Sequence, residues 1–448
     1  MAKSVSPETG RAALLALVKE GSPLGPLKVM AEHVGRFFQI PLPGFHPYVV
    51  FGPEANRKVL VTERDKVLWR NTDPVTDLLR RGVLIVDGEE HDHYRKLMEP
   101  PLHPSRLPDY TSRFIFHTDR VSAQWRDGET VDMLIEARKI ALLIIMDTLF
   151  SKDVWNDLSL IWTPVLKSIA YISPGMWILW RKIPRIGFKK HLKVLDEYLH
   201  KIIEERRINN KVILRSDSDE ESPVIRRDSS LPKNRVAQND IPNDLLQHLI
   251  DAGLTDDIIR DQMLTMLIAG HDTSTALLAW TFALLGQHPD IHARLLEEVN
   301  TQEKSPLLDQ VIKESLRLYP PIHIGNRRIA EEIQFSEGNV PVDERMFYSI
   351  YLTHRDPSIW ENAEDFCPER FAHGRKTPPF SYVPFGGGPR ACIGGAFGQA
   401  EARIVMKRLL QTHQFEFTNH KIHAHMGATL EPRPGVRMKV SKRTPVVE

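Results

Sequence analysis

Residues 385–395 read Phe-Gly-Gly-Gly-Pro-Arg-Ala-Cys-Ile-Gly-Gly and lead into a helical pattern from Ala396 to Leu410. Three consecutive glycines allow backbone N–H groups to approach a bound group without side-chain collisions. Cys392 comes just before the expected start of the helix, where the helix dipole favours a thiolate over a thiol, and Arg390 adds a cation two residues earlier. A thiolate stabilised in this way can be a nucleophile, a metal ligand or a redox sensor.

The composition excludes several classes of protein. The 448 residues include 59 Lys+Arg and 58 Asp+Glu, which gives a formal net charge of +1, so no basic excess indicates nucleic-acid binding. With 42% apolar and 26% charged residues, the chain has the balance of a globular protein rather than that of a disordered or fibrous one. Two cysteines, Cys367 and Cys392, cannot build a disulfide framework or a four-thiolate zinc site.

Two apolar segments could in principle lie on a membrane or span one. Residues 12–18 are too few to span a bilayer; they could lie on a membrane surface, but we expect a helix that packs on the protein itself. Residues 263–286 are long enough, but Asp272 at their centre would be costly in lipid, so we expect a buried helix and no transmembrane anchor. We therefore expect a soluble, cytoplasmic protein, with a shortened form of a membrane-anchored protein as the alternative.

Helical periodicity outweighs strand-like alternation, which predicts a mainly α fold with a smaller β-rich lobe. We expect helices at 137–150, 189–206 and 256–285, the last with Thr255 as its N-cap and Gly286 as its C-terminal stop. Strands are expected at 48–51, 58–61, 328–335, 346–351 and 436–441. Residues 209–240 lack any sustained period and are expected to form a mobile surface excursion.

The cysteine loop, residues 385–395, resembles the haem-ligand loop of the cytochrome P450 haem-thiolate monooxygenases. Phe385, Gly388, Arg390, Cys392 and Gly394 fill the pattern Phe-x-x-Gly-x-Arg-x-Cys-x-Gly. Three other segments resemble motifs of this family in the family's order: residues 269–274 (Ala-Gly-His-Asp-Thr-Ser), 314–317 (Glu-Ser-Leu-Arg) and 368–371 (Pro-Glu-Arg-Phe). The resemblance implies a single haem domain over residues 1–448, with haem b between the long central helix and the cysteine loop.

The resemblance also implies roles for the motif residues. Cys392 would be the axial ligand of the haem iron, whereas Cys367 is left with a structural role. Thr273 would hold dioxygen by a hydrogen bond while Asp272 relays protons. Considered without the resemblance, a mid-helix threonine bonds back to the preceding turn and the acid pairs elsewhere.

Charged residues outside the cysteine loop gain roles from the same resemblance. Glu314 and Arg317 could be a surface ion pair, but the resemblance implies a buried network with Arg370. His91 and Arg95, four residues apart, would bind a haem propionate, as would Arg390. Arg328 would be a further propionate contact, with Arg327 as its rival and His354 as another candidate.

Substrate contacts are suggested by position along the chain, and core packing is the alternative for each. The candidates are apolar except for Thr429, which indicates a lipophilic substrate. They are Leu78, Leu79, Ile85, Leu267, Ala269, Ile322, Ile324, Ala428 and Thr429.

The resulting hypothesis is a monooxygenase that inserts one oxygen atom of O2 into a fatty acid, terpenoid or polyketide-like molecule. Because no cysteine cluster follows the loop, NAD(P)H electrons are expected to arrive through a ferredoxin or flavodoxin and a reductase. A short connector at residues 300–307 favours the soluble bacterial members of the family. A peroxide-driven or rearranging haem-thiolate enzyme, or a non-catalytic haem sensor or carrier, are the alternatives.

Overall fold

Helices dominate the computed structural model, which describes residues 5–40, 45–69, 74–173, 186–218, 241–372, 377–419 and 421–443. The α-helices are α1 (Pro7–Glu20), α2 (Leu24–Val34), α3 (Pro53–Arg57), α4 (Pro74–Leu79), α5 (Gly88–Leu102), α6 (Leu107–Ser122), α7 (Met133–Phe150), α8 (Leu158–Ile172), α9 (Phe188–Ser218), α10 (Leu245–Asp251), α11 (Asp256–Gln287), α12 (Pro289–Thr301), α13 (Pro306–Leu318), α14 (Ile350–Thr353) and α15 (Gly395–Thr412). None of these described helices combines the length and the apolarity that a membrane crossing needs.

The strands are short and form small sheets. They are β1 (Phe37–Gln39), β2 (Tyr48–Val50), β3 (Val67–Leu68), β4 (Thr130–Asp132), β5 (Ile324–Ile329), β6 (Ile333–Phe335), β7 (Gly338–Val340), β8 (Arg345–Ser349), β9 (His413–Phe417), β10 (His423–Met426), β11 (Leu430–Arg433) and β12 (Arg437–Lys442). The prediction of a mainly α fold with a smaller β-rich lobe is therefore confirmed.

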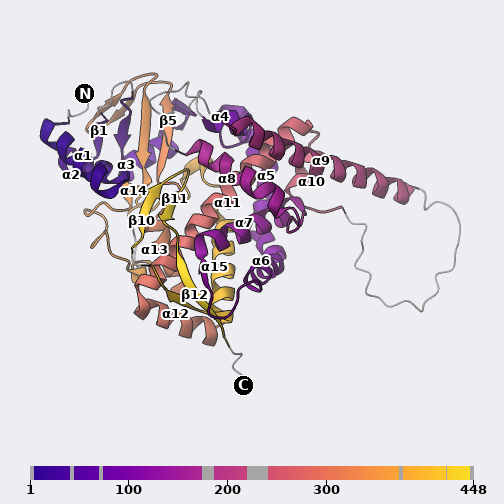
Figure 1. Cartoon of the computed structure of the whole chain (residues 1–448). Coiled ribbons are helices and arrows are strands. Elements are labelled where there is room, and N and C mark those ends of the chain that lie inside the picture. Colours follow the sequence, from indigo (N-terminus) through magenta and orange to yellow (C-terminus); the bar gives the residue numbers. More distant parts are fainter. Residues whose placement is uncertain are drawn as a thin grey trace, which may run out of the picture.

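The largest sheet joins two distant parts of the chain. Its strand order is β1-β2-β8-β5-β3, in which β2 runs parallel to β8 and β3 runs antiparallel to β5. Strands from before residue 70 therefore pair with strands from after residue 320, which interleaves the lobes in sequence. Figure 1 shows this sheet beside α1 and α2, with the helical lobe on its other side.

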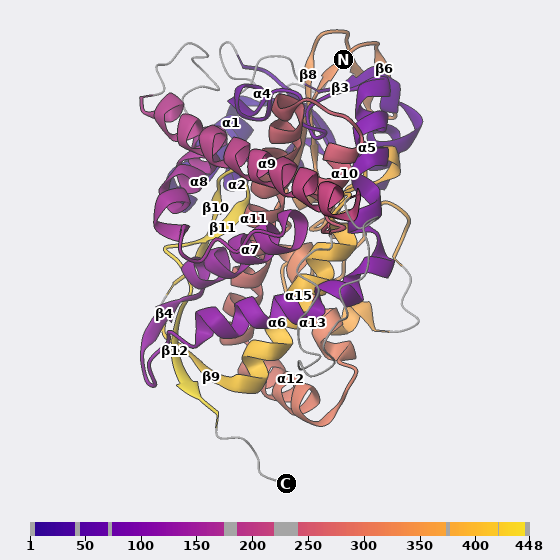
Figure 2. The same cartoon turned by 90° about the vertical axis from the view of Figure 1, so that its right-hand side faces the viewer.

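The long helix α11 crosses the helical lobe and is buried over most of its length. The Thr255 hydroxyl accepts a hydrogen bond from the Ile258 backbone N–H, as expected of an N-cap. Along its course α11 contacts α7, α9, α13, α15 and β11, and Figure 2 shows it behind α7 and α9. The expected buried helix is thus present.

Four local expectations differ from the structure. Gly286 does not end α11, because the helix continues to Gln287; a Cβ at Gly286 would lie 2.6 Å from the Phe417 ring, so this glycine permits close packing. Residues 58–62 form a π-helical turn instead of a strand, since they continue the helical path of α3. The predicted excursion at 209–240 begins as helix, because α9 extends to Ser218, and residues 219–240 lie outside the described residues.

The fourth difference concerns α1. We expected its apolar segment to pack on the protein, but only Thr9 and Ala13 of the helix are buried. Its apolar side chains Leu14, Leu15 and Val18 are 62%, 70% and 77% exposed. The helix therefore docks through one narrow stripe and leaves its other apolar residues on the surface.

A buried ion pair joins the two helices that flank residues 219–240. Arg206 of α9 donates two hydrogen bonds to the Asp244 carboxylate, at 2.9 and 2.8 Å, and both side chains are buried. Asp244 is also the N-cap of α10 and accepts from the Gln247 backbone N–H. One carboxylate therefore pins α9 and starts α10 at the same time.

Asp244→Ala should lower the free energy of unfolding by about 3–5 kcal/mol, because it leaves the Arg206 charge buried without its partner and removes a helix cap. Urea denaturation measures this loss. Asp256→Ala is the matched control, because Asp256 pairs with Arg207, the residue after Arg206, and both of these side chains are partly exposed. We expect this variant to lose at most about 1 kcal/mol. Equal losses in the two variants would contradict the prediction.

Candidate active site at the cysteine loop

Backbone hydrogen bonds fold the cysteine loop back on itself. The Cys392 N–H donates to the Phe385 carbonyl at 2.8 Å, and the Ala391 N–H donates to the Gly388 carbonyl at 3.0 Å. Gly388 has a φ of 63°, and a Cβ there would lie 2.2 Å from the Leu60 backbone oxygen. Only glycine fits this contact, which holds the loop against the π-helical turn at Lys58–Thr62.

The Cys392 side chain is accessible to solvent and yet closely surrounded by protein. Desolvation by this surrounding is the largest influence on its pKa and raises it, while a hydrogen bond from the Gly394 N–H and the charge of Arg95 lower it. The expectation that the protein alone favours the thiolate is therefore not supported. A bound cation is what would ionise this thiol, since a metal deprotonates its thiol ligand.

Charged side chains from separate elements gather beside the loop. Arg95 of α5 donates to the Ala391 carbonyl at 2.6 Å, and Arg390 donates to Asp87 at 2.5 Å and to the Val86 carbonyl at 2.6 Å. His91 is buried with its Nδ1 2.8 Å from Asp92; burial, and then the charges of Arg390 and Arg95, lower its pKa. The structure thus brings together the three predicted propionate contacts His91, Arg95 and Arg390.

The two arginines of β5 differ in their surroundings, because neighbouring strand residues point to opposite faces. Arg327 stacks on the rings of Trp69 and Tyr348, and its charge acts with burial to lower the pKa of Arg390. Arg328 instead donates to Asp343 at 2.8 Å. The structure therefore places Arg327, the rival, in the cluster beside the cysteine loop and pairs the predicted Arg328 elsewhere.

Asp272 lies buried on α11 and is only partly satisfied. Its Oδ2 accepts a hydrogen bond from the Thr429 hydroxyl at 2.8 Å, whereas its Oδ1 has no partner among the described residues. Burial, and then the charge of Glu431, raises the pKa of Asp272 to about 6. This carboxyl can therefore take up and release a proton near neutral pH.

Thr273 follows Asp272 and is half-buried. Its hydroxyl donates to the Ala269 carbonyl at 2.7 Å, which is the bond to the preceding turn that a lone mid-helix threonine would make. The hydroxyl oxygen keeps its capacity to accept a hydrogen bond. The neighbouring His271 is fully buried, and burial lowers its pKa to about 3, so it stays neutral.

A second buried acid near this turn of α11 was not predicted. Glu401 of α15 accepts a hydrogen bond from the Ser274 hydroxyl at 2.6 Å, and its other oxygen has no partner among the described residues. Burial raises the pKa of Glu401 to about 8, so it is protonated at pH 7. The signal in the sequence was a single glutamate at a core-facing position of the helix after the cysteine loop.

The structure also brings Glu314, Arg317 and Arg370 together. Glu314 and Arg317 are fully buried; Arg317 donates to both Glu314 oxygens at 2.8 Å and to three backbone carbonyls, at His354, Ala363 and Asp365. Arg370 donates to Glu314 at 3.2 Å. The segment that precedes the cysteine loop is therefore tied to α13.

His354 takes part in the same connection and does not lie with the propionate candidates. Its Nε2 accepts from the Val383 N–H at 2.9 Å, and its Nδ1 lies 3.2 Å from the Arg317 carbonyl. Burial lowers its pKa to about 3, so the ring is neutral. It connects α13 to Val383, two residues before the cysteine loop.

The substrate candidates fall into three groups. Leu78, Leu79, Ile85 and Leu267 are buried in the main hydrophobic cluster, and Ala269 is half-buried on the same helix as Leu267. Ile322 is 41% exposed and Ile324 packs on the separate cluster around α2, so the structure does not bring these two to the others. Ala428 and Thr429 lie in the turn between β10 and β11, next to Asp272.

These residues fit a haem. Cys392 offers an accessible sulfur. Arg95 and Arg327 bond only backbone carbonyls and aromatic faces among the described residues, so two guanidinium groups are left to pair with two propionate carboxylates. The unpartnered Asp272 oxygen and the half-buried Thr273 hydroxyl lie next to each other on α11. Thiolate ligand, carboxylate partners and proton-carrying groups are all present.

Comparisons with known proteins agree with this geometry. The family model described as "Cytochrome P450" matches residues 12–436. Relatives include "Cytochrome P450 4d8" from Drosophila melanogaster, 26% identical over 87% of this chain and 90% of its own length, and "Putative cytochrome P450 120" from Synechocystis, 29% identical over 92% and 90%. A solved structure described as "Retinoic acid bound cyanobacterial CYP120A1" has a TM-score of 0.77 and 25% identity, covering 93% of this chain and 94% of its own.

Glu314→Ala or Arg317→Ala should yield protein without haem and lower the free energy of unfolding by about 3–5 kcal/mol. Glu314→Ala leaves the buried Arg317 charge without a carboxylate, and Arg317→Ala leaves the buried Glu314 charge with only the more distant Arg370 as its cation. Haem absorbance per protein and urea denaturation measure the two effects. Glu369→Ala is the control, since its partner Arg294 is exposed, and should retain haem with a loss within about 1 kcal/mol. Haem-replete Glu314→Ala protein would refute the prediction.

Asp272→Asn should change how stability depends on pH. The raised pKa means that folding favours protonated Asp272, so the wild type loses stability as pH rises from about 4 through about 6. The isosteric amide does not ionise and so does not lose this stability. The unfolding free energy of the variant minus that of the wild type should therefore rise by up to about 3 kcal/mol between pH 4 and pH 7. Urea denaturation across this range tests it, and a constant difference between the two proteins would show the expectation to be wrong.

Proposed function

The chain belongs to the cytochrome P450 family of haem-thiolate monooxygenases, and from this premise we propose that it oxygenates a lipophilic small molecule with electrons from separate redox proteins. When bound, the haem supplies the iron at which dioxygen is activated. In this proposal the Cys392 thiolate holds that iron. Arg95, Arg390 and His91 bind the propionates, and Arg327 takes the place of Arg328 in this set.

The observation that carries the monooxygenase assignment for this chain is the pair of adjacent groups on α11. Asp272, with a pKa of about 6 and one unpartnered oxygen, can hold a proton next to the Thr273 hydroxyl. Thr273 would position the dioxygen substrate and pass protons to it. Glu401 of α15, protonated at pH 7 and bonded to Ser274, offers a second proton donor beside this turn of α11. A haem sensor or carrier, and a peroxide-driven enzyme, would not need such groups.

The apolar side chains near α11 support a lipophilic substrate. Leu78, Leu79, Ile85 and Leu267 belong to one hydrophobic cluster, and Ala269 lies on the same helix. The related cyanobacterial structure is described as bound to retinoic acid, which is a lipophilic carboxylic acid. We propose a substrate of this chemical kind, with fatty acids and terpenoids as the first compounds to test.

Electrons would come from a ferredoxin or flavodoxin that docks at the cysteine loop. Gly388 and Pro389 of this loop are exposed, so a small protein can approach within a few residues of Cys392. NAD(P)H and a reductase would supply that donor.

Reconstitution of the haem-loaded enzyme with a surrogate ferredoxin, its reductase and NADPH tests this function. Ligands from a fatty-acid and terpenoid library that shift the haem absorbance should give a product with one oxygen atom from labelled O2. Thr273→Ala should keep the carbon monoxide difference spectrum of a thiolate-bound haem but divert most of the consumed NADPH to peroxide.

Thr275→Ala is the matched control, because its hydroxyl makes the same bond to the preceding turn, at 2.8 Å from the His271 carbonyl, but is fully buried. It should leave coupling unchanged. Unchanged coupling in Thr273→Ala, or product formed only with added peroxide, would reject the proposed mechanism.

A further inference from the structure

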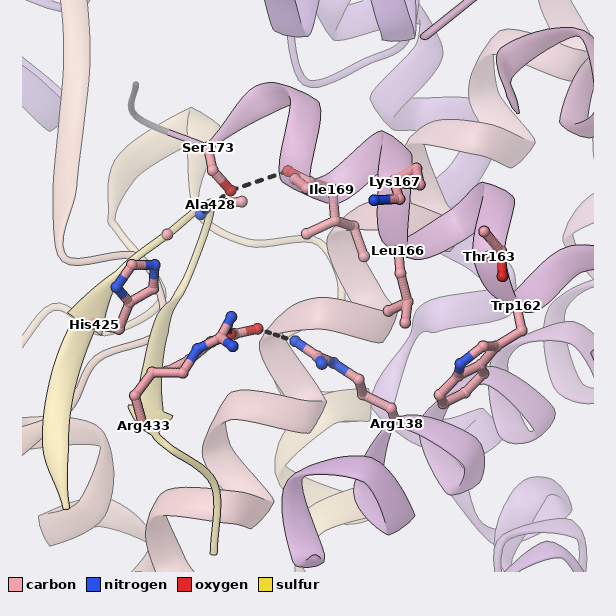
Figure 3. A pocket seen from close by; sticks show the side chains of 13 residues that line it. Arg138, Trp162, Thr163, Leu166, Lys167, Ile169, Ser173, His425, Ala428 and Arg433 are labelled. Atoms are coloured by element: carbon pink, nitrogen blue, oxygen red, sulfur yellow. Dashed lines mark hydrogen bonds and ion pairs between the residues drawn. The ribbon is translucent and has the colours of Figure 1, made fainter. Parts of the chain in front are cut away.

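A cavity of about 530 Å³ lies between α8, α7 and the β10–β11 hairpin. Figure 3 shows Leu166, Lys167 and Trp162 of α8 on one side and His425 and Arg433 of the hairpin on the other, with Arg138 of α7 between them. Its volume falls within the range of small-molecule sites. Among the substrate candidates only Ala428 lines this cavity, so it is distinct from the group of apolar residues around Leu267.

The wall of the cavity carries an excess of positive charge. Arg138, Lys167 and Arg433 are its cations and Glu431 is its one carboxylate, which leaves 3 − 1 = 2 positive charges with His425 neutral. Both arginines share that carboxylate: Arg138 donates to one Glu431 oxygen, and Arg433 donates to the other at 3.0 Å. One acid therefore serves two guanidinium groups.

All three cations at the wall keep donors available for a ligand. Within the described residues, the one hydrogen bond of the Arg433 guanidinium runs from a single Nη to Glu431. Lys167 is exposed and makes no ion pair with any residue in the described part of the chain. The Arg138 Nε is buried and likewise has no hydrogen-bond partner there. A buried donor without a partner is costly, so an acceptor at this place would be stabilising.

The rest of the wall is apolar. Trp162 and Leu166 project from α8 toward the cavity, and Ile169 and Ala428 line it near Ser173 (Figure 3). An aromatic ring and branched aliphatic chains favour a flat or extended hydrocarbon body. The cavity is therefore amphipathic, with cations at one part of the wall and a hydrocarbon surface at another.

We propose that this cavity binds an amphipathic organic carboxylate, with its carboxylate at Lys167 and Arg433 and its hydrocarbon body against Trp162 and Leu166. Charged donors to a carboxylate supply orientation, and the apolar wall supplies area. The inference rests on this cavity alone and does not require that the chain be a monooxygenase.

The cavity is also adjacent to the acid on α11. The Arg138 carbonyl lies 3.1 Å from His271 Nε2, and Thr429, which follows Ala428, bonds Asp272. Arg138, Arg433 and Glu431 all act on Asp272 through their charges. A bound carboxylate would therefore be an additional negative charge in the surroundings of Asp272.

Dansyl-undecanoic acid is a suitable probe, because its fluorescence rises in an apolar site and it carries a single carboxylate. Titration of the haem-loaded protein should show saturable binding without a shift in haem absorbance. Lys167→Gln and Arg433→Gln should each weaken binding about tenfold, Lys167→Arg should restore it, and the amide of the probe should bind as weakly as the two variants bind the acid.

Lys193→Gln is the matched control, since Lys193 is likewise an exposed helical lysine, on α9, and does not line the cavity. It should leave the affinity unchanged. Equal affinity of the wild type, Lys167→Gln and Arg433→Gln would overturn the proposal, as would an absence of saturable binding or a haem shift that accompanies all of it. Because this readout needs neither electrons nor product, its failure is separable from failure of the monooxygenase function.

Discussion

The arginine at position 317 is the group on which the arrangement of the site depends. Its guanidinium is fully buried, where a charge is tolerated only if every donor has a partner, and it bonds the Glu314 carboxylate and the carbonyls of His354, Ala363 and Asp365. Those carbonyls belong to the chain that leads to the cysteine loop. One planar cation on α13 therefore fixes the segment that leads to Cys392.

Burial also sets the protonation states around α11. Asp272 and Glu401 are both buried carboxyl groups with pKa values raised to about 6 and about 8, whereas the pKa of buried His271 falls to about 3. The common cause is desolvation, which disfavours whichever form is charged. Asp272 and the neutral His271 are adjacent on α11, and Glu401 of α15 bonds Ser274 of the same α11 turn, which suits proton transfer more than it suits stability.

Several features were predictable from residues alone because their cause is local. The glycines of the cysteine loop, the Thr255 cap and the long apolar run of α11 each depend on neighbours a few residues away. Features that depend on distant partners were not predictable. Gly286 was expected to stop a helix but contacts Phe417, and residues 58–61 were expected to form a strand but belong to a π-helical turn that contacts the loop at Gly388. Which of Arg327 and Arg328 lies beside the cysteine loop depends on which face of β5 points toward the loop. Only the pairing of β5 with β3 and β8 defines that face.

The amino-acid sequence by itself determined the class of fold, the identity of Cys392 as the one cysteine in a glycine-rich setting, and the spacing of Glu314, Arg317, Asp272 and Thr273. These follow from helical periodicity and from motif spacing, which are properties of short segments. Tertiary structure decided which charges meet. Glu401 reaches Ser274 only because α15 packs on α11, and Glu431 reaches Arg138 only because the β10–β11 hairpin lies against α7, so a burial-dependent pKa and an excess of charge in a cavity cannot be obtained from residue order.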